Sequence, residues 1–125
     1  MDLVSSHTLE VLTNYHPEAA RELTNLQAVL TESSLDPDLL KLCSDYFKAA
    51  LRNDTWSGPE ALTDLQAACL AVCEQFMVSV SATSNEQVHR LGQHLSADEL
   101  YNLMYAIYLI ESSQRLEMTL EATLQ

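Results

Sequence analysis

Apolar side chains recur along most of the chain at three- and four-residue intervals, which is the spacing of an amphipathic helix. Breaker residues divide this pattern into segments, among them Pro17, Pro37 and the pair Gly58-Pro59. The pattern predicts helices over residues 3–14, 17–32, 37–53, 64–77, 85–92 and 95–125. Residues 78–81, which read Val-Ser-Val-Ser, fit both a fraying helix end and an extended segment.

Several of the predicted helices begin at a residue that can cap the free backbone N–H groups of the first turn. One of these starts is Asp36-Pro37, with the capping residue directly before a proline. Three other starts are capping boxes, formed by Thr63 with Gln66, Ser84 with Gln87, and Ser96 with Glu99. We therefore predict an all-α fold, a bundle of about six helices in a single domain over residues 1–125.

The predicted C-terminal helix is long and apolar on two sides. One face carries Leu100, Leu103, Met104, Ile107, Ile110 and Met118. The opposite side carries Tyr101, Tyr105, Tyr108, Leu109 and Leu116. A helix that is apolar on both sides has to be enclosed, by its own chain or by a partner. The second apolar side therefore predicts association between copies of the chain.

The chain is strongly acidic, with a formal net charge of −12 over 125 residues. Its Lys and Arg residues are spread along the sequence and form no basic patch for phosphates, so we expect no nucleic-acid partner. We also expect no membrane partner, because acidic surfaces are repelled by anionic lipids and no apolar run approaches roughly twenty residues.

The start of the chain and its cysteines indicate a location. Met1-Asp2-Leu3 and the residues that follow lack the basic and apolar segments of a signal peptide. The 3 cysteines show no disulfide-framework spacing, which is typical of a reducing compartment. We therefore expect a cytoplasmic protein.

A group of polar side chains interrupts the apolar surface of the last helix. Glu111 and Gln114 share a face with Ile107 and Met118, so they line either an internal pocket or a subunit contact. Arg115 follows Glu111 by four residues, the favourable order for an ion pair within a helix. Glu111 is the candidate catalytic residue, because a buried carboxylate can transfer protons. The candidate ligand-binding residues are Glu111, Gln114, Arg115 and Tyr108.

The spacing of Cys and His residues indicates neither a metal site nor a cofactor. Cys69 and Cys73 share one helical face, either as a dithiol or soft-ligand pair or as ordinary core side chains. They lie in mid-helix, whereas reactive pairs are usually C-x-x-C at a helix N-terminus, so we predict that these two and Cys43 are core residues. Glu86 and His89 form one E-x-x-H motif, but a di-iron site needs two.

Three segments carry a family resemblance that spans nearly the whole chain. Residues 34–42 read SLDPDLLKL, residues 62–68 read LTDLQAA, and residues 95–100 read LSADEL, with Gln114-Arg115-Leu116 further along. These segments resemble the "LDP-x-L-x-E-L", "LT-x-x-E-x-A" and "LS-D-E-E-I … N-R-L" helices of the alkylhydroperoxidase D-like (AhpD-like), or carboxymuconolactone decarboxylase, family. The resemblance implies an all-helical subunit that assembles into trimers or hexamers.

Active members of that family carry a C-x-x-C-x-x-x-H motif and an upstream Glu that relays protons. In the matching register, this chain has Asp54 and Ser57 at the cysteine positions, Ala61 at the histidine position and Lys41 at the glutamate position. The segment that joins the motif to the next helix is also shortened, to about residues 53–62. The resemblance therefore implies a degenerate active site that has lost thiol peroxidase chemistry.

The first hypothesis is a non-catalytic subunit of that fold, which acts in a homo-oligomer by binding a small apolar ligand near Glu111 and Gln114 or a protein partner. The alternative is an enzyme of the decarboxylase or isomerase type with non-thiol acid–base chemistry. Glu111 would be its acid or base, and Tyr108 or Arg115 would polarise an oxyanion. A third hypothesis is a structural adaptor whose acidic helices bind a basic partner through salt-sensitive contacts.

Overall fold

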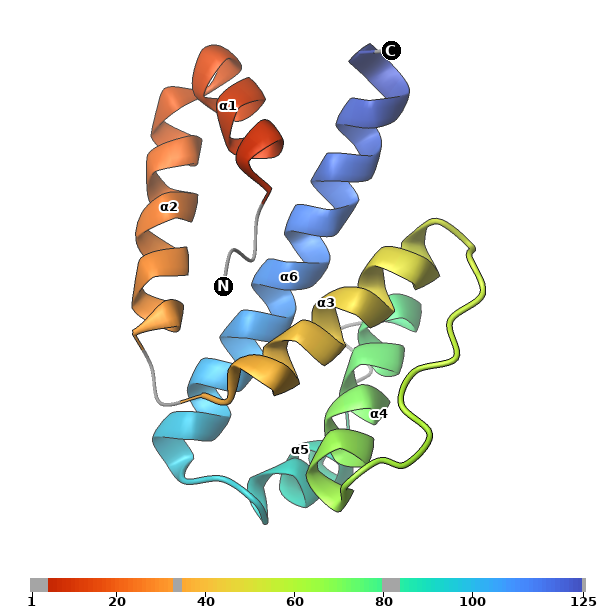
Figure 1. Ribbon diagram of the computed structural model, residues 1–125. Coiled ribbons are helices and arrows are strands. Elements are labelled where there is room, and N and C mark those ends of the chain that lie inside the picture. Colours follow the sequence, from red (N-terminus) through yellow and green to blue (C-terminus); the bar gives the residue numbers. More distant parts are fainter. Residues whose placement is uncertain (1–4, 33–34, 80–83, 125) are drawn as a thin grey trace.

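A computed structural model of the chain describes residues 5–32, 35–79 and 84–124. Within these ranges the regular structure is helical and there is no strand, which confirms the predicted all-α fold (Figure 1). The helices are α1 (Ser6–Tyr15), α2 (Pro17–Thr31), α3 (Pro37–Leu51), α4 (Asp64–Val78), α5 (Asn85–Gly92) and α6 (Ala97–Leu124). Parts of the sequence-based predictions lie outside the described residues, namely residues 1–4, Ser34, Val80, Ser81 and Gln125.

The predicted helix starts are formed by the predicted caps. Ser96 Oγ accepts a hydrogen bond from the backbone N–H of Glu99 over 3.2 Å, and Glu99 Oε1 accepts one from the backbone N–H of Ser96 over 3.0 Å. The boxes at the starts of α4 and α5 are closed in the same reciprocal way. Asp36 caps α3 in front of Pro37. Local sequence therefore sets where these helices begin.

Helix α6 lies at the centre of the molecule and contacts helices on several sides (Figure 1). Helix α3 crosses α6 and shares its most extensive contact, while α4 packs against α3 and α5 packs against both α4 and α6. Helices α1 and α2 pair with each other as a hairpin, and α1 contacts the C-terminal half of α6. The last turns of α6 extend past α3 beside this hairpin.

The core lies where α3, α4 and α6 meet. Its buried side chains include Phe47 from α3, Val72 and Phe76 from α4, and Leu103 and Ile107 from α6. The helical spacing predicted that all five face inward, and the structure confirms it.

One side chain that was predicted to face inward does not. Val29 on α2 is 61% exposed. Helix α2 packs on the core through Leu23 and Leu26 and otherwise pairs with α1, which leaves the side chain of Val29 open to solvent. The prediction for Val29 is therefore wrong.

Helix α6 is long, at 28 residues, but it is not apolar all round. Its first half buries Leu103, Ile107 and Ile110, whereas its second half exposes Arg115 and Glu121. The prediction of a long apolar helix is therefore wrong in character, because the α6 side chains that belong to the core all lie at or before Ile110 and charged side chains follow. Across the described residues, no helix combines the length and the apolar character needed to cross a lipid bilayer.

The segment between α3 and α4, residues 52–63, is fixed by backbone geometry and an aromatic contact. Asn53 has a φ of 57° where α3 has ended, and Gly58 has a φ of 63°, which glycine adopts without strain. The ring of Trp56 packs edge-on against Tyr46 of α3, with 5.5 Å between centroids. A Cβ on Gly58 would lie 2.7 Å from the Trp56 ring, so glycine at this position also permits the ring packing.

Candidate functional site

Three tyrosines on α6 form an exposed aromatic patch. The side chains of Tyr101, Tyr105 and Tyr108 are 63%, 44% and 56% exposed. Together with Phe76 and Met104 they line a hollow of about 360 Å³, and we call these five residues the Tyr face. The rings of Tyr101 and Tyr105 are tilted against each other with 4.8 Å between centroids. Within one chain, the described residues leave this side of α6 exposed.

The Tyr face is electrically neutral. None of its residues is acidic or basic, and hydrogen bonding with Tyr105 raises the pKa of Tyr101 above its ordinary value, so this phenol stays protonated at neutral pH. Tyrosine combines a large apolar ring with a hydroxyl that can remain hydrated or find a partner. Such a surface can pack against another protein without burying a charge.

Glu111 is buried on α6 and pairs with Arg115 one turn later. Arg115 Nε donates a hydrogen bond to Glu111 Oε1 over 2.7 Å, as the spacing predicted. The Arg115 side chain is half exposed and keeps part of its charged group in solvent. This pair satisfies the buried carboxylate within a single helix.

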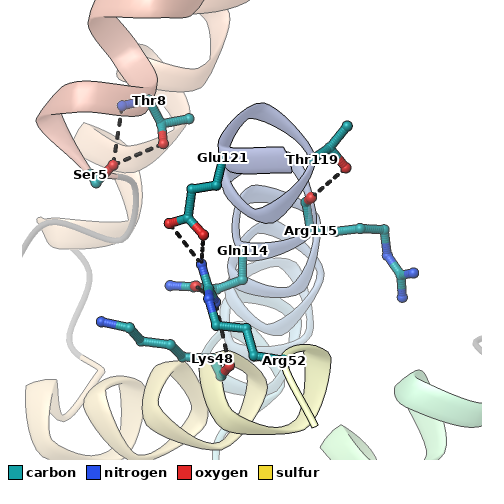
Figure 2. Close-up of polar contacts among 8 residues, drawn as sticks. All are labelled: Ser5, Thr8, Lys48, Arg52, Gln114, Arg115, Thr119 and Glu121. Carbon is teal, nitrogen blue, oxygen red and sulfur yellow. Dashed lines mark hydrogen bonds and ion pairs between the residues drawn. The ribbon is translucent and has the colours of Figure 1, made fainter. Parts of the chain in front are cut away.

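Gln114 belongs to a different group, which joins α3 to α6 (Figure 2). Arg52, at the end of α3, donates to Gln114 Oε1 over 3.3 Å and forms an ion pair with Glu121 over 3.3 Å. Arg52 also donates to the backbone carbonyl of Lys48 over 3.3 Å. Figure 2 shows Arg115 on the opposite side of α6, pointing away from Arg52. The sequence did not single out Arg52 or Glu121, because 62 residues separate Arg52 from Gln114.

The four side chains predicted to bind a ligand are therefore divided among three surroundings. Glu111 and Arg115 bond to each other, Gln114 bonds to Arg52, and Tyr108 lines the Tyr face. Of the four, Arg115 and Tyr108 are exposed, and Arg115 is paired with Glu111 whereas Tyr108 lines the Tyr face.

A second hollow lies beside the segment that was aligned, in the sequence resemblance, with the thiol motif of AhpD-like proteins. It measures about 350 Å³, and its lining includes Lys41 and Asp45 of α3 and Trp56 of the following segment. Lys41 Nζ donates to Asp45 over 2.9 Å, so the two charged groups are paired on the surface. The other three motif positions are exposed in the segment between α3 and α4, namely Asp54, Ser57 and Ala61. This place offers neither a thiol nor an imidazole.

The three cysteines meet inside the core. Cys43 comes from α3, and Cys69 and Cys73 come from successive turns of α4. All three are fully buried, which confirms the prediction that they are core residues. Cys43 Sγ lies 3.3 Å from Cys69 Sγ, and the three Sγ atoms lie within 4.8 Å of one another. We call these residues the thiol cluster.

The thiol cluster is polarised by its own hydrogen bonds. Hydrogen bonding from Cys43 and Cys73 lowers the pKa of Cys69 below the ordinary thiol value. Hydrogen bonding with Cys69 raises the pKa of Cys43, hydrogen bonding with both neighbours raises the pKa of Cys73, and burial adds to both increases. The sequence predicted the pair in α4 but not the third member, because Cys43 is 26 residues from Cys69 and no local spacing links them.

No protein-family model, no curated protein and no solved structure matches this chain. The polar pairs on α6 are satisfied within the chain, and the thiol cluster is enclosed by the core. The Tyr face is both exposed and neutral, which makes it the strongest candidate for binding.

Proposed function

We propose that this protein is a subunit of a homo-oligomer that acts by binding rather than by catalysis, with the Tyr face as the contact between subunits. The observation that carries the proposal is the exposure of Tyr101, Tyr105 and Tyr108 on a helix whose other side forms the core. Aromatic residues are enriched at protein interfaces, and contiguous exposed apolar patches mark interaction sites.

Electrostatics favours a second copy at the Tyr face. Each chain carries a formal charge of −12, so two copies repel each other wherever their acidic surfaces meet. The Tyr face has no charged residue, and copies can meet there without burying an unpaired charge. A basic protein partner, by contrast, would be attracted to the acidic surfaces away from this patch.

The scaffold we propose is a degenerate AhpD-like, or carboxymuconolactone decarboxylase-like, subunit in a trimer or hexamer. The support for the scaffold is the order of the resembling segments along the helices. The support for the loss of thiol chemistry is the replacement of all four motif positions, where Lys41 is paired with Asp45 on the surface. We place the protein in the cytoplasm, where reducing conditions keep its three cysteines as free thiols.

Native mass spectrometry of the full chain tests the oligomer. We expect a trimer or hexamer of the 14.0 kDa chain at micromolar concentration. Tyr105→Glu places a charge inside the Tyr face and is expected to give monomers. The matched control is Tyr15→Glu, because Tyr15 on α1 is 76% exposed and lies outside the Tyr face.

A wild-type protein that remains a 14.0 kDa monomer would contradict the proposal, as would equal dissociation by both variants. A small additional mass on each subunit would support the hypothesis of a small apolar ligand over that of a protein partner. The same spectra therefore report on subunit contact and on ligand together.

The burial of Glu111 favours a second candidate, an enzyme that uses this carboxylate as a general acid or base. Such an enzyme would act on a substrate that displaces Arg115, which holds Glu111 Oε1 in the free protein. Turnover by Glu111→Gln on candidate 2-oxo acids and lactones tests it. Loss of turnover with the oligomer intact would support the enzyme, and the absence of turnover by the wild type would leave the binding function.

A further inference from the structure

We propose that the thiol cluster is a site for a soft monovalent metal ion and that its occupant is Cu(I). The observation is that thiols from two different helices converge at one point in the core: Cys43 from α3 meets Cys69 and Cys73 from α4. This site goes beyond the proposed binding function, because it lies inside the core and not on the Tyr face.

The spacing of the sulfur atoms fits a three-coordinate site. With a metal–sulfur bond of about 2.3 Å, as in zinc thiolates, a planar trigonal site places its sulfur atoms about 4.0 Å apart. The Sγ atoms of Cys43 and Cys69 lie 3.3 Å apart, and no pair in the thiol cluster exceeds 4.8 Å. The required distance of about 4.0 Å lies between the separation of this pair and the upper limit for the cluster.

The type and number of ligands favour Cu(I) over other metals. Among the described residues, the thiol cluster is the only group of three or more Cys, His, Asp or Glu side chains that could hold a metal ion together. Its ligand atoms are all sulfur, without a carboxylate or an imidazole. Soft thiolates select Cu(I), zinc and iron–sulfur clusters, but structural zinc and iron–sulfur sites take four protein ligands, so a set of three thiolates fits Cu(I) best. Because the three cysteines are fully buried, water is poorly placed to supply a fourth ligand, and a d¹⁰ ion that accepts three ligands suits this enclosure.

Binding exchanges protons for the metal and transfers no electron. Each thiol that becomes a thiolate ligand releases one proton to solvent. The ion reaches the buried sulfurs through brief local separation of α3 and α4, so loading of the folded protein is expected to be slow.

Titration with Cu(I) tests the site. The full-length protein is reduced, freed of metal and kept without oxygen, and Cu(I) is supplied from a chromophoric chelator of known affinity while native mass spectrometry counts bound ions. We expect one Cu(I) per chain. X-ray absorption at the copper edge should show only sulfur neighbours, three in number, which tests the site on the wild-type protein alone.

Cys43→Ala should weaken Cu(I) binding by more than about 100-fold, since loss of even an indirect partner of a metal ligand costs about 10–100-fold. Val72→Ala is the matched control. It shortens a fully buried core side chain, on the neighbouring helix α4, and keeps every thiol. Circular dichroism checks that both variants remain helical.

The proposal is overturned by failure to take Cu(I) from the chelator, by nitrogen or oxygen neighbours at copper, or by equal weakening in both variants. It is also overturned if Zn(II) displaces Cu(I) at equal free concentration. The oligomer test on the Tyr face is independent of each of these outcomes.

Discussion

At the scale of single residues, two basic side chains show how burial determines the contribution of an ion pair to the stability of the fold. The side chain of Arg52 is 19% exposed and bonds to Gln114 and Glu121, whereas that of Lys41 is 67% exposed and bonds to Asp45 alone. Arg52→Ala should lower the free energy of unfolding by about 1–3 kcal/mol, because it leaves the buried Gln114 oxygen without its donor.

Lys41→Ala is the control for this comparison and should change the free energy of unfolding by less than about 1 kcal/mol, as exposed pairs usually do. Urea denaturation of the two variants at one protein concentration measures both values. Equal losses of unfolding free energy in the two variants would mean that the contacts of Arg52 stabilise the fold no more than an exposed ion pair does.

Glu99 gives the start of α6 a dependence on pH. Hydrogen bonds from the backbone N–H and the side chain of Ser96 lower the pKa of Glu99 below its ordinary value. The Glu99 carboxyl therefore binds a proton less tightly in the folded state than in the unfolded state. Its charge stabilises the folded protein at a pH above the unfolded pKa of about 4.3. This stabilisation is lost as the pH falls through the lower, folded value.

Glu99→Gln keeps an oxygen acceptor for the Ser96 N–H but cannot titrate. We expect the difference in thermal midpoint between wild type and this variant to shrink between pH 5 and strongly acidic pH. The other carboxylates are protonated at low pH in both proteins, so the effect of their lost repulsion cancels in the difference between the two midpoints. A constant difference over that range would contradict the role of the Glu99 charge.

At the scale of helices, side chains that look alike in the sequence differ according to what their helix packs against. Ile107 and Val29 were both predicted to face inward, but Ile107 is fully buried and Val29 is exposed. Ile107→Ala should cost about 2–5 kcal/mol, and Val29→Ala should stay within about 0.5 kcal/mol. Chemical denaturation of both variants checks this, and a small loss for Ile107→Ala would contradict the central position of α6.

The same contrast explains how far the sequence predicts the structure. Helix starts were predictable because a capping box joins residues three apart, as in Ser96 and Glu99. The ion pair of Glu111 with Arg115 was predictable for the same reason, since both lie on one helix. Local chemistry therefore gives the helices and the contacts within them.

The sites that depend on two helices were not predictable in this way. Cys43 meets Cys69 across 26 residues, and Arg52 meets Gln114 across 62. Each contact depends on the angle at which α3 crosses its neighbours. The spacing of residues within one helix does not indicate which residue of another helix it will contact. The exposure of Val29 also depends on tertiary packing, because α2 pairs mainly with α1.

At the scale of the whole molecule, the chain divides into a tightly packed part and a more loosely attached part. Helices α3, α4 and α6 share the core, and the thiol cluster lies within it. The hairpin of α1 and α2 is joined to this core by partly buried side chains such as Leu23 and Leu26 and by the contact of α1 with α6. Less buried apolar surface on the hairpin means a lower free energy of local opening.

Hydrogen exchange measured by mass spectrometry should therefore show two levels of protection. Backbone amides of α3, α4 and the first half of α6 should exchange last, and amides of α1 and α2 should exchange earlier. Leu26→Ala should speed exchange in the hairpin and leave α3 and α4 unchanged, because Leu26 packs on the edge of the core rather than within it. Faster exchange throughout the chain in that variant would instead mean that the hairpin and the core open together, as one cooperative unit.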